Sequence, residues 1–101
     1  MTVTPEGEIQ AYLKKRVGQT GGEFRKLAWT GRRGAPDALV WWPGPSFAFV
    51  EVKAANGRLS TLQDREIGRL RRAGFQVAVV FCKEDVDEVV LALTQPVGCI
   101  Q

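Results

Sequence analysis

The segment Phe47-Ala-Phe-Val-Glu-Val-Lys53 is an apolar run that carries one carboxylate and ends on an ammonium group. A run of this kind indicates a β-strand. Side chains alternate across a strand, so Glu51 and Lys53 emerge on the same face near the strand's end. Taken alone, the segment is best interpreted as a solvated ion pair on an edge strand.

The segment just before this strand changes that interpretation. Gly34-Ala-Pro-Asp37 leads into a second apolar run over 38–42, and a proline-glycine turn over 43–46 separates the two runs. If the runs pair as a hairpin, counting outward from the turn places Asp37 opposite the Lys53 end, within one or two residues of register. Asp37 by itself is best interpreted as a turn-forming residue, but the hairpin would bring it to Glu51.

A pair of carboxylates at one end of a hairpin favours a bound cation. Two such groups about 4 Å apart repel by about 4 kcal/mol at an effective dielectric constant of 20. An all-oxygen site that keeps bound waters suits Mg²⁺ or Mn²⁺. The sequence therefore predicts a divalent metal site at Asp37 and Glu51.

Turn and capping signals divide the rest of the chain into elements. The expected elements are a helix over 5–17, strands over 23–30, 38–42 and 47–53, a helix from Ser60 to Gly74, a strand over 76–82 and a helix over 86–94. Thr4 is the expected cap of the first helix. The expected capping boxes are Ser60 with Gln63 and Asp85 with Glu88.

The order α-β-β-β-α-β-α predicts an α/β fold, in which a mixed four-stranded sheet is flanked by helices. At 101 residues the chain is expected to form a single domain, 1–101.

Composition excludes several classes of enzyme. The chain has no histidine, which removes Ser-His-Asp and Cys-His catalysis, H-E-x-x-H metalloproteases and histidine-dependent nucleases. Cys82 and Cys99 are expected to be free thiols, too few for a zinc site within one chain. No apolar run reaches the length of a membrane span, and the polar first ten residues do not indicate a secretory signal, so a cytoplasmic location is expected.

The net charge of +3 is unevenly distributed. Residues 1–73 hold thirteen Lys and Arg against seven Asp and Glu, whereas residues 74–101 hold one lysine against four acidic residues. One end of the domain is therefore positive, which suits a polyanionic partner although it does not require one.

The motifs taken together resemble a known family. The ordered set Glu8, Gly34-x-Pro-Asp37, Glu51-x-Lys53 and Ser60-x-x-Gln63 is similar to the VRR-NUC branch of the PD-(D/E)xK nucleases. The resemblance extends over roughly residues 5–82. It implies a restriction-endonuclease-like fold and in-line hydrolysis of DNA that leaves a 5′-phosphate and a 3′-hydroxyl.

By this resemblance, Asp37, Glu51 and the main-chain carbonyl of Val52 hold the metal ion, while Lys53 orients or helps to deprotonate the attacking water. Glu8 is expected to assist the metal from the first helix, with compensation of the helix dipole as its alternative role.

Gln63 has a local argument as well. Gln63, Ile67, Leu70 and Gly74 form one helix face that must lie on the sheet, so Gln63 is expected near Lys53, where it could orient the lysine or bind a phosphate. Its alternative role is to cap the helix with Ser60, and the two roles are compatible.

Arginines provide a candidate DNA track. Arg32 and Arg33 lie in the glycine turn before Asp37, where they are expected to clamp a phosphate beside the metal. Arg65, Arg69 and Arg72 follow a 4, 3 spacing along a different face of the second helix, and they either contact DNA or form a solvated face.

The resulting hypothesis is a Mg²⁺-dependent, structure-selective DNA endonuclease. VRR-NUC proteins of this length resemble virus or phage types that act as homodimers in a bacterial or phage-infected cell. A two-fold dimer presents two active sites to paired strands, so the resemblance also implies Holliday-junction resolution. The alternatives are a PD-(D/E)xK nuclease acting on duplex or flap DNA, a non-catalytic DNA-binding module, and a small interaction protein with a chance motif.

Overall fold

The computed structural model describes residues 4–95, and its elements follow the predicted order. The helices are α1 (Pro5–Gln19), α2 (Thr61–Arg72) and α3 (Lys83–Thr94), and the strands are β1 (Glu23–Lys26), β2 (Ala38–Trp41), β3 (Phe47–Val52) and β4 (Val77–Val80). β1, β2 and β3 are antiparallel neighbours, and β4 lies parallel to β3, which gives the sheet order β1-β2-β3-β4. The predicted mixed four-stranded sheet flanked by helices is confirmed.

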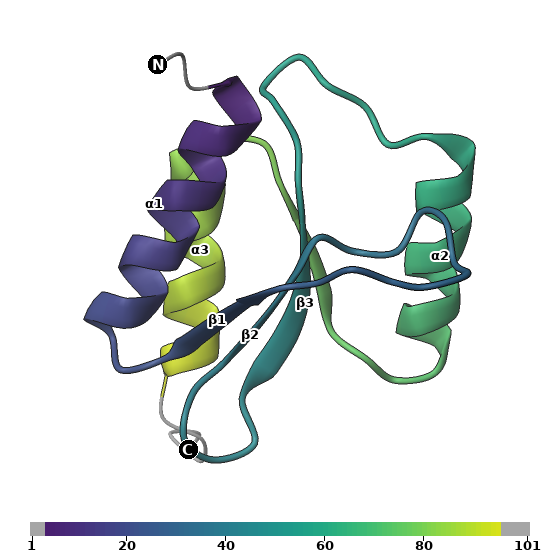
Figure 1. Cartoon of the computed structure of the whole chain (residues 1–101). Helices are drawn as coiled ribbons and strands as arrows, with labels where there is room; N and C mark the ends of the chain where they lie inside the picture. The colour runs from purple at the N-terminus through teal and green to yellow at the C-terminus, as the bar shows by residue number, and fades with distance from the viewer. Residues whose placement is uncertain (1–3, 96–101) are drawn as a thin grey trace.

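The sheet lies between two helical layers. Figure 1 shows α1 and α3 side by side on one face, and α2 on the other. Alternate β3 residues, Ala48, Val50 and Val52, are buried in the core that the sheet forms with α1 and α3. On the opposite face α2 contributes a single buried residue, Ile67. The apolar core is therefore mostly on the α1–α3 side of the sheet.

The first two helices have the expected caps. The Thr4 hydroxyl accepts a hydrogen bond from the Gly7 N–H at 2.9 Å, and α1 continues two residues beyond its predicted end. At α2, Ser60 and Gln63 form the predicted capping box. The helix ends before Gly74, whose φ of +98° favours glycine.

β1 is shorter than its predicted range over 23–30. The ladder with β2 ends at Lys26, followed by one hydrogen bond from the Leu27 N–H to the Asp37 carbonyl at 2.8 Å. The next residue on the opposing segment is Pro36, which has no N–H to continue the ladder.

The predicted start of the last helix is wrong. α3 begins at Lys83 rather than Val86, and its cap residue, Cys82, makes no side-chain cap hydrogen bond. Asp85 lies inside the first turn, where its carboxylate accepts a hydrogen bond from the Phe81 N–H at 2.9 Å. An acidic residue near a helix start can occupy either the cap or the third helical position, and Asp85 occupies the third helical position.

The cysteine prediction is confirmed in part, since Cys82 is a free thiol. Cys99 lies outside the described residues. Within residues 4–95, no helix is long and apolar enough to cross a bilayer.

Candidate active site

Strand register brings Asp37 to Glu51, as predicted. In the β2–β3 hairpin Ala38 pairs with Val50, so Asp37, one residue before β2, lies across from Glu51. The Val52 N–H donates a hydrogen bond to Oδ2 of Asp37 at 3.0 Å. Asp37 is therefore fixed to the end of β3 by the backbone of that strand.

Glu51 is a buried carboxylate, with 2% of its surface exposed. Its Oε2 accepts a hydrogen bond from Nε2 of Gln63 at 2.9 Å, and it lies 3.7 Å from Nζ of Lys53. Its Oε1 is buried without a hydrogen-bond partner among residues 4–95. Burial first, and then the charge of Asp37, raise the pKa of the Glu51 carboxyl from 4.5 to about 7, although Lys53 acts in the opposite direction.

Lys53 stands where strand alternation predicted it, beside Glu51 on the α2 side of the sheet. Its main-chain N–H bonds to the Val80 carbonyl at 2.9 Å, so the backbone at this point is still held by β4. The side chain is 15% exposed. A mostly buried lysine side chain therefore places its ammonium group at the edge of the carboxylate pair.

Gln63 has both of the roles that the sequence suggested. Its Oε1 accepts a hydrogen bond from the Ser60 N–H at 2.9 Å, which closes the capping box. Its Nε2 donates to Glu51 from the opposite end of the same amide. One side chain thus joins the start of α2 to the buried carboxylate, although its contact is with Glu51 and not with Lys53.

The acidic residue that α1 presents to this site is Glu6, not Glu8. A hollow of about 210 Å³ is lined by Thr4, Glu6, Gly7, Gln10, Lys26, Asp37 and Val52. Glu6 and Glu8 are both exposed, but Glu8 lines a different hollow, together with Ala11, Tyr12, Lys15 and Lys83. The structure therefore does not bring Glu8 to Asp37.

The sequence contained a signal for Glu6. The residues Glu6, Gln10, Leu13 and Val17 follow a 4, 3, 4 spacing, the same pattern that identified the inward face of α2. Leu13 and Val17 are buried, and the first two members of that row line the hollow that also holds Asp37.

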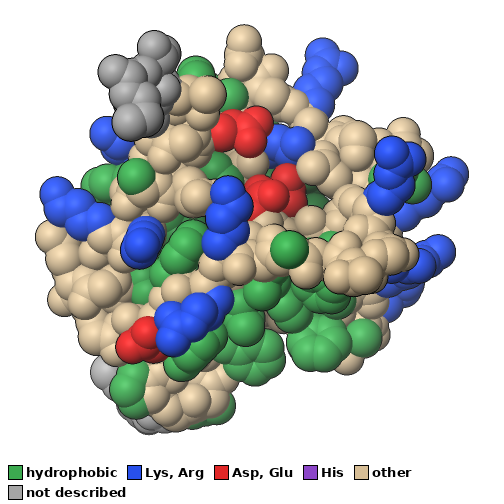
Figure 2. All heavy atoms as spheres, in the orientation of Figure 1, with side chains coloured by type: hydrophobic (Ala, Val, Ile, Leu, Met, Phe, Trp, Pro, Cys, Tyr) green, Lys and Arg blue, Asp and Glu red, His purple; other side chains and the backbone are tan. Residues whose placement is uncertain are grey.

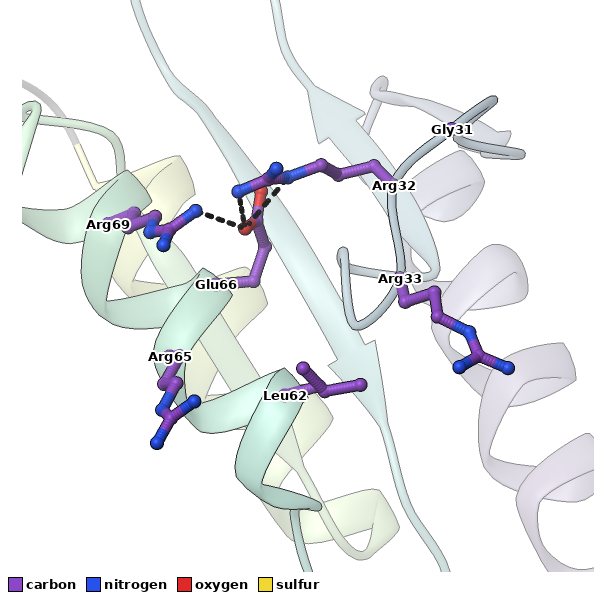
Figure 3. A pocket seen from close by; sticks show the side chains of 7 residues that line it. All are labelled: Gly31, Arg32, Arg33, Leu62, Arg65, Glu66 and Arg69. Atoms are coloured by element: carbon purple, nitrogen blue, oxygen red, sulfur yellow. Dashed lines mark hydrogen bonds and ion pairs between the residues drawn. The ribbon is translucent and has the colours of Figure 1, made fainter.

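Arg32 and Arg33 take different directions. Nε and Nη2 of Arg32 donate to Oε1 of Glu66 on α2, at 3.2 and 3.0 Å, and Nη1 of Arg69 lies 3.9 Å from the same oxygen. Hydrogen bonding to Glu66 raises the pKa of Arg32. Figure 3 shows Arg32 reaching across to Glu66, whereas Arg33 points away from α2.

The other three arginines of the predicted DNA track form an exposed row on α2. Arg65, Arg69 and Arg72 line a hollow together with Asp64 and Gly68. In Figure 2, carboxylate atoms lie near the centre of the face in view, with lysine or arginine side chains around them. Acidic groups inside a basic surround suit a metal-assisted reaction on a polyanion.

The residues present fit a divalent cation. Oε1 of Glu51 lacks a partner in the described part of the chain, and a cation beside it would offset the repulsion from Asp37. Residues 4–95 hold no cluster of three or more His, Cys, Asp or Glu that could hold an ion. Water, a main-chain carbonyl and phosphate oxygens would therefore have to complete the shell, as is usual for Mg²⁺.

A mixed sheet that brings an Asp, a Glu and a Lys together at one end defines the PD-(D/E)xK class of nucleases. Comparisons with known proteins agree with this class. The family model described as VRR-NUC domain matches residues 7–83. Over 93 residues the chain is 36% identical to "Putative nuclease p44" of Acyrthosiphon pisum secondary endosymbiont phage 1. This match covers 92% of the chain and 99% of that relative.

A solved structure described as "VRR_NUC domain" matches with a TM-score of 0.82 at 42% identity, covering 88% of this chain and 97% of that one. The chain belongs to the VRR-NUC family. It is a nuclease domain, which makes it a hydrolase acting on DNA.

Proposed function

We propose that this nuclease domain is a divalent-metal-dependent, structure-selective DNA endonuclease. The observation that carries the proposal is the orphaned Oε1 of Glu51, a buried carboxylate oxygen beside a second carboxylate. Burying a charge without compensation is costly, so such an oxygen calls for a cation. When bound, Mg²⁺ or Mn²⁺ would lower the pKa of a coordinated water and offset the charge that develops on the phosphate.

Each residue of the site then has a defined task. Asp37, Glu51 and the Val52 carbonyl hold the metal. Lys53 would orient the attacking water or, as a neutral amine, help to deprotonate it, and in its ammonium form it would stabilise the charge that grows on the phosphate. Gln63 orients Glu51. We assign the supporting acidic role expected of Glu8 to Glu6, because Glu6 shares a hollow with Asp37 and Val52 whereas Glu8 does not.

The arginines divide into two groups in their proposed contact with DNA. Arg33, Arg65 and Arg72 are exposed, and no ion pair joins them to another residue between 4 and 95, so they are free to contact phosphates. Arg32 and Arg69 are partly neutralised by Glu66 and are expected to contribute less. Loss of one phosphate contact is expected to weaken binding to all DNA sequences and to reduce its salt dependence.

The finer part of the proposal is a homodimer that resolves Holliday junctions. Its support is the family membership together with the size of the chain, which leaves little surface for reading sequence. A two-fold dimer would present two equivalent sites to the paired strands of a branched substrate.

The test is cleavage of a panel of synthetic DNAs by purified protein in Mg²⁺ or Mn²⁺, with EDTA as the blank. Four-way junctions, flaps, linear duplex and single strands are compared for wild type and Asp37→Ala. We expect metal-dependent cutting that favours the junction, abolished in Asp37→Ala with DNA affinity retained. Preference for plain duplex would overturn junction selectivity, and metal-independent DNA binding without cutting would leave only the binding module.

A further inference from the structure

Glu66 joins α2 to the loop that precedes Asp37. Its side chain is 12% exposed and accepts two hydrogen bonds from Arg32, and Arg69 lies near the same oxygen. Figure 3 shows these side chains meeting across a hollow between the loop and the helix. A carboxylate among arginines weakens attraction to a polyanion, so its presence here needs a reason other than DNA binding.

The helix that carries Glu66 has little apolar anchorage of its own. α2 buries only Ile67, and its last turn is held by a hydrogen bond from Nη2 of Arg71 to the Val77 carbonyl at 2.6 Å. Its first turn carries Gln63, which bonds to the buried carboxylate of Glu51. The position of Gln63 therefore depends on polar contacts that hold the start of the helix.

The loop is packed closely against that first turn. A Cβ atom added at Gly34 would lie 2.7 Å from the main-chain carbon and oxygen of Leu62, and the φ of Gly34 is +82°. Pro36 and Asp37 follow within three residues. The loop therefore lies between the segment that leads to Asp37 and the first turn of α2, which carries Gln63.

We propose that Glu66 is a positioning residue for the metal site, which holds the Gly31–Gly34 loop against α2 through Arg32 and so keeps both Asp37 and Gln63 at Glu51. This inference rests on the proposed metal-dependent function. Glu66 touches neither the carboxylate pair nor a substrate, and it acts only through the two segments that it joins.

The experiment compares Glu66→Ala, Glu66→Gln and the matched control Glu88→Ala, an exposed glutamate on α3. Steady-state cleavage is measured over a Mg²⁺ titration, and binding of Mn²⁺ without DNA is followed by thermal unfolding. For Glu66→Ala we expect kcat to fall about tenfold and half-saturating metal to rise about tenfold, at the lower end of the losses that follow removal of a direct partner of a metal ligand. KM for DNA should stay level or fall, because a negative charge has been removed.

Two further variants sharpen the test. Glu66→Gln keeps an acceptor oxygen for Arg32 and should recover part of kcat, and this variant decides the matter if Glu66→Ala is unfolded. In a double-mutant cycle, Arg32→Ala combined with Glu66→Ala should be no slower than Glu66→Ala alone.

Wild-type kcat and metal half-saturation in both Glu66 variants, or additive losses in the cycle, would overturn the positioning role. Failure of the wild-type protein to cut any DNA with metal would instead overturn the proposed function. The Mn²⁺ titration without DNA still decides whether Glu66 supports the metal site.

Discussion

The two faces of the sheet are covered through different kinds of contact. On the α1–α3 face, Leu13, Val50 and Val86 are fully buried in an apolar core. On the α2 face, β3 presents Glu51, and the helix is attached largely through hydrogen bonds and an ion pair. Alternate residues of one strand therefore serve opposite needs. The apolar core lies mostly on one face and the candidate active site on the other, so mutations on the first face should lower stability and mutations on the second should lower activity.

The largest expected effect is on activity from the α2 face. Glu51→Gln should slow cleavage by about a thousandfold, because a neutral amide cannot replace a metal-binding carboxylate. The same change should leave the metal-free protein at least as stable as wild type at pH 8, since it removes a buried charge that repels Asp37. Cleavage rates and thermal unfolding check the two parts, with the exposed Glu88→Gln as control. A marked loss of stability in Glu51→Gln would contradict the proposed difference between the two faces of the sheet.

On the α1–α3 face a mutation is expected to lower stability and to leave the cleavage rate unchanged. Leu13→Ala removes a fully buried side chain and should lower the free energy of unfolding by about 3 kcal/mol. Cleavage per folded molecule should remain at the wild-type rate, measured well below the unfolding midpoint. Urea denaturation gives the first quantity, and Leu91→Ala, at a leucine that is 61% exposed, is the matched control with little expected change.

Stability of the metal-free protein should depend on pH through Glu51. Its pKa in the folded chain, about 7, lies above the ordinary value of 4.5, so the folded state retains a proton that the unfolded state has lost. The contribution of this group is therefore complete below pH 4.5, and it falls as pH rises to about 7, by at most about 3 kcal/mol. The free energy of unfolding should therefore change less with pH in Glu51→Gln than in wild type, as measured by denaturation at several pH values between 4.5 and 7. An equal change with pH in the two proteins would contradict the interpretation of Glu51 as a buried carboxylate with a raised pKa.

The smallest expected effect separates the two roles of Gln63. Gln63→Ala should lower stability by about 1 kcal/mol because the helix cap is lost. It should also slow cleavage about tenfold because the hydrogen bond to Glu51 is lost. Ser60→Ala removes the cap hydroxyl but leaves Gln63 free to bond to Glu51, so it should lose stability alone. If both variants cleaved equally slowly, orientation of Glu51 by the glutamine would be disproved.

The sequence predicted those parts of the site that depend on short-range periodicity. A hairpin turn sets the register of β2 against β3, which is why Asp37 could be placed opposite Glu51 by counting. Helical periodicity placed Gln63 on the inward face of α2 in the same way. Each of these inferences needs only local geometry and one neighbouring strand.

Other parts depend on how separate segments dock. Glu6 and Glu8 lie on one helical turn, and Glu6 lines the hollow that holds Asp37 and Val52, whereas the family resemblance pointed to Glu8, which lines a different hollow. The ion pair of Arg32 with Glu66 depends on a loop in which Gly31 and Gly34 adopt positive φ angles of 72° and 82°. Local sequence does not specify the direction of a side chain on such a loop, so the partner of Arg32 could not be foreseen. The division into a single domain over 1–101 remains a prediction.

A metal site at the carboxylate pair is tested most simply by a titration of Mn²⁺ into the protein without DNA, followed by thermal unfolding at pH 8. A metal that binds only the folded state stabilises it by RT ln(1 + [metal]/Kd), so the unfolding temperature keeps rising with the logarithm of the metal concentration above Kd. A metal site at Asp37 and Glu51 predicts this concentration-dependent rise for wild type and its absence in both Asp37→Asn and Glu51→Gln. An unchanged unfolding temperature for wild type, or an equal rise in all three proteins, would contradict a metal site at the carboxylate pair.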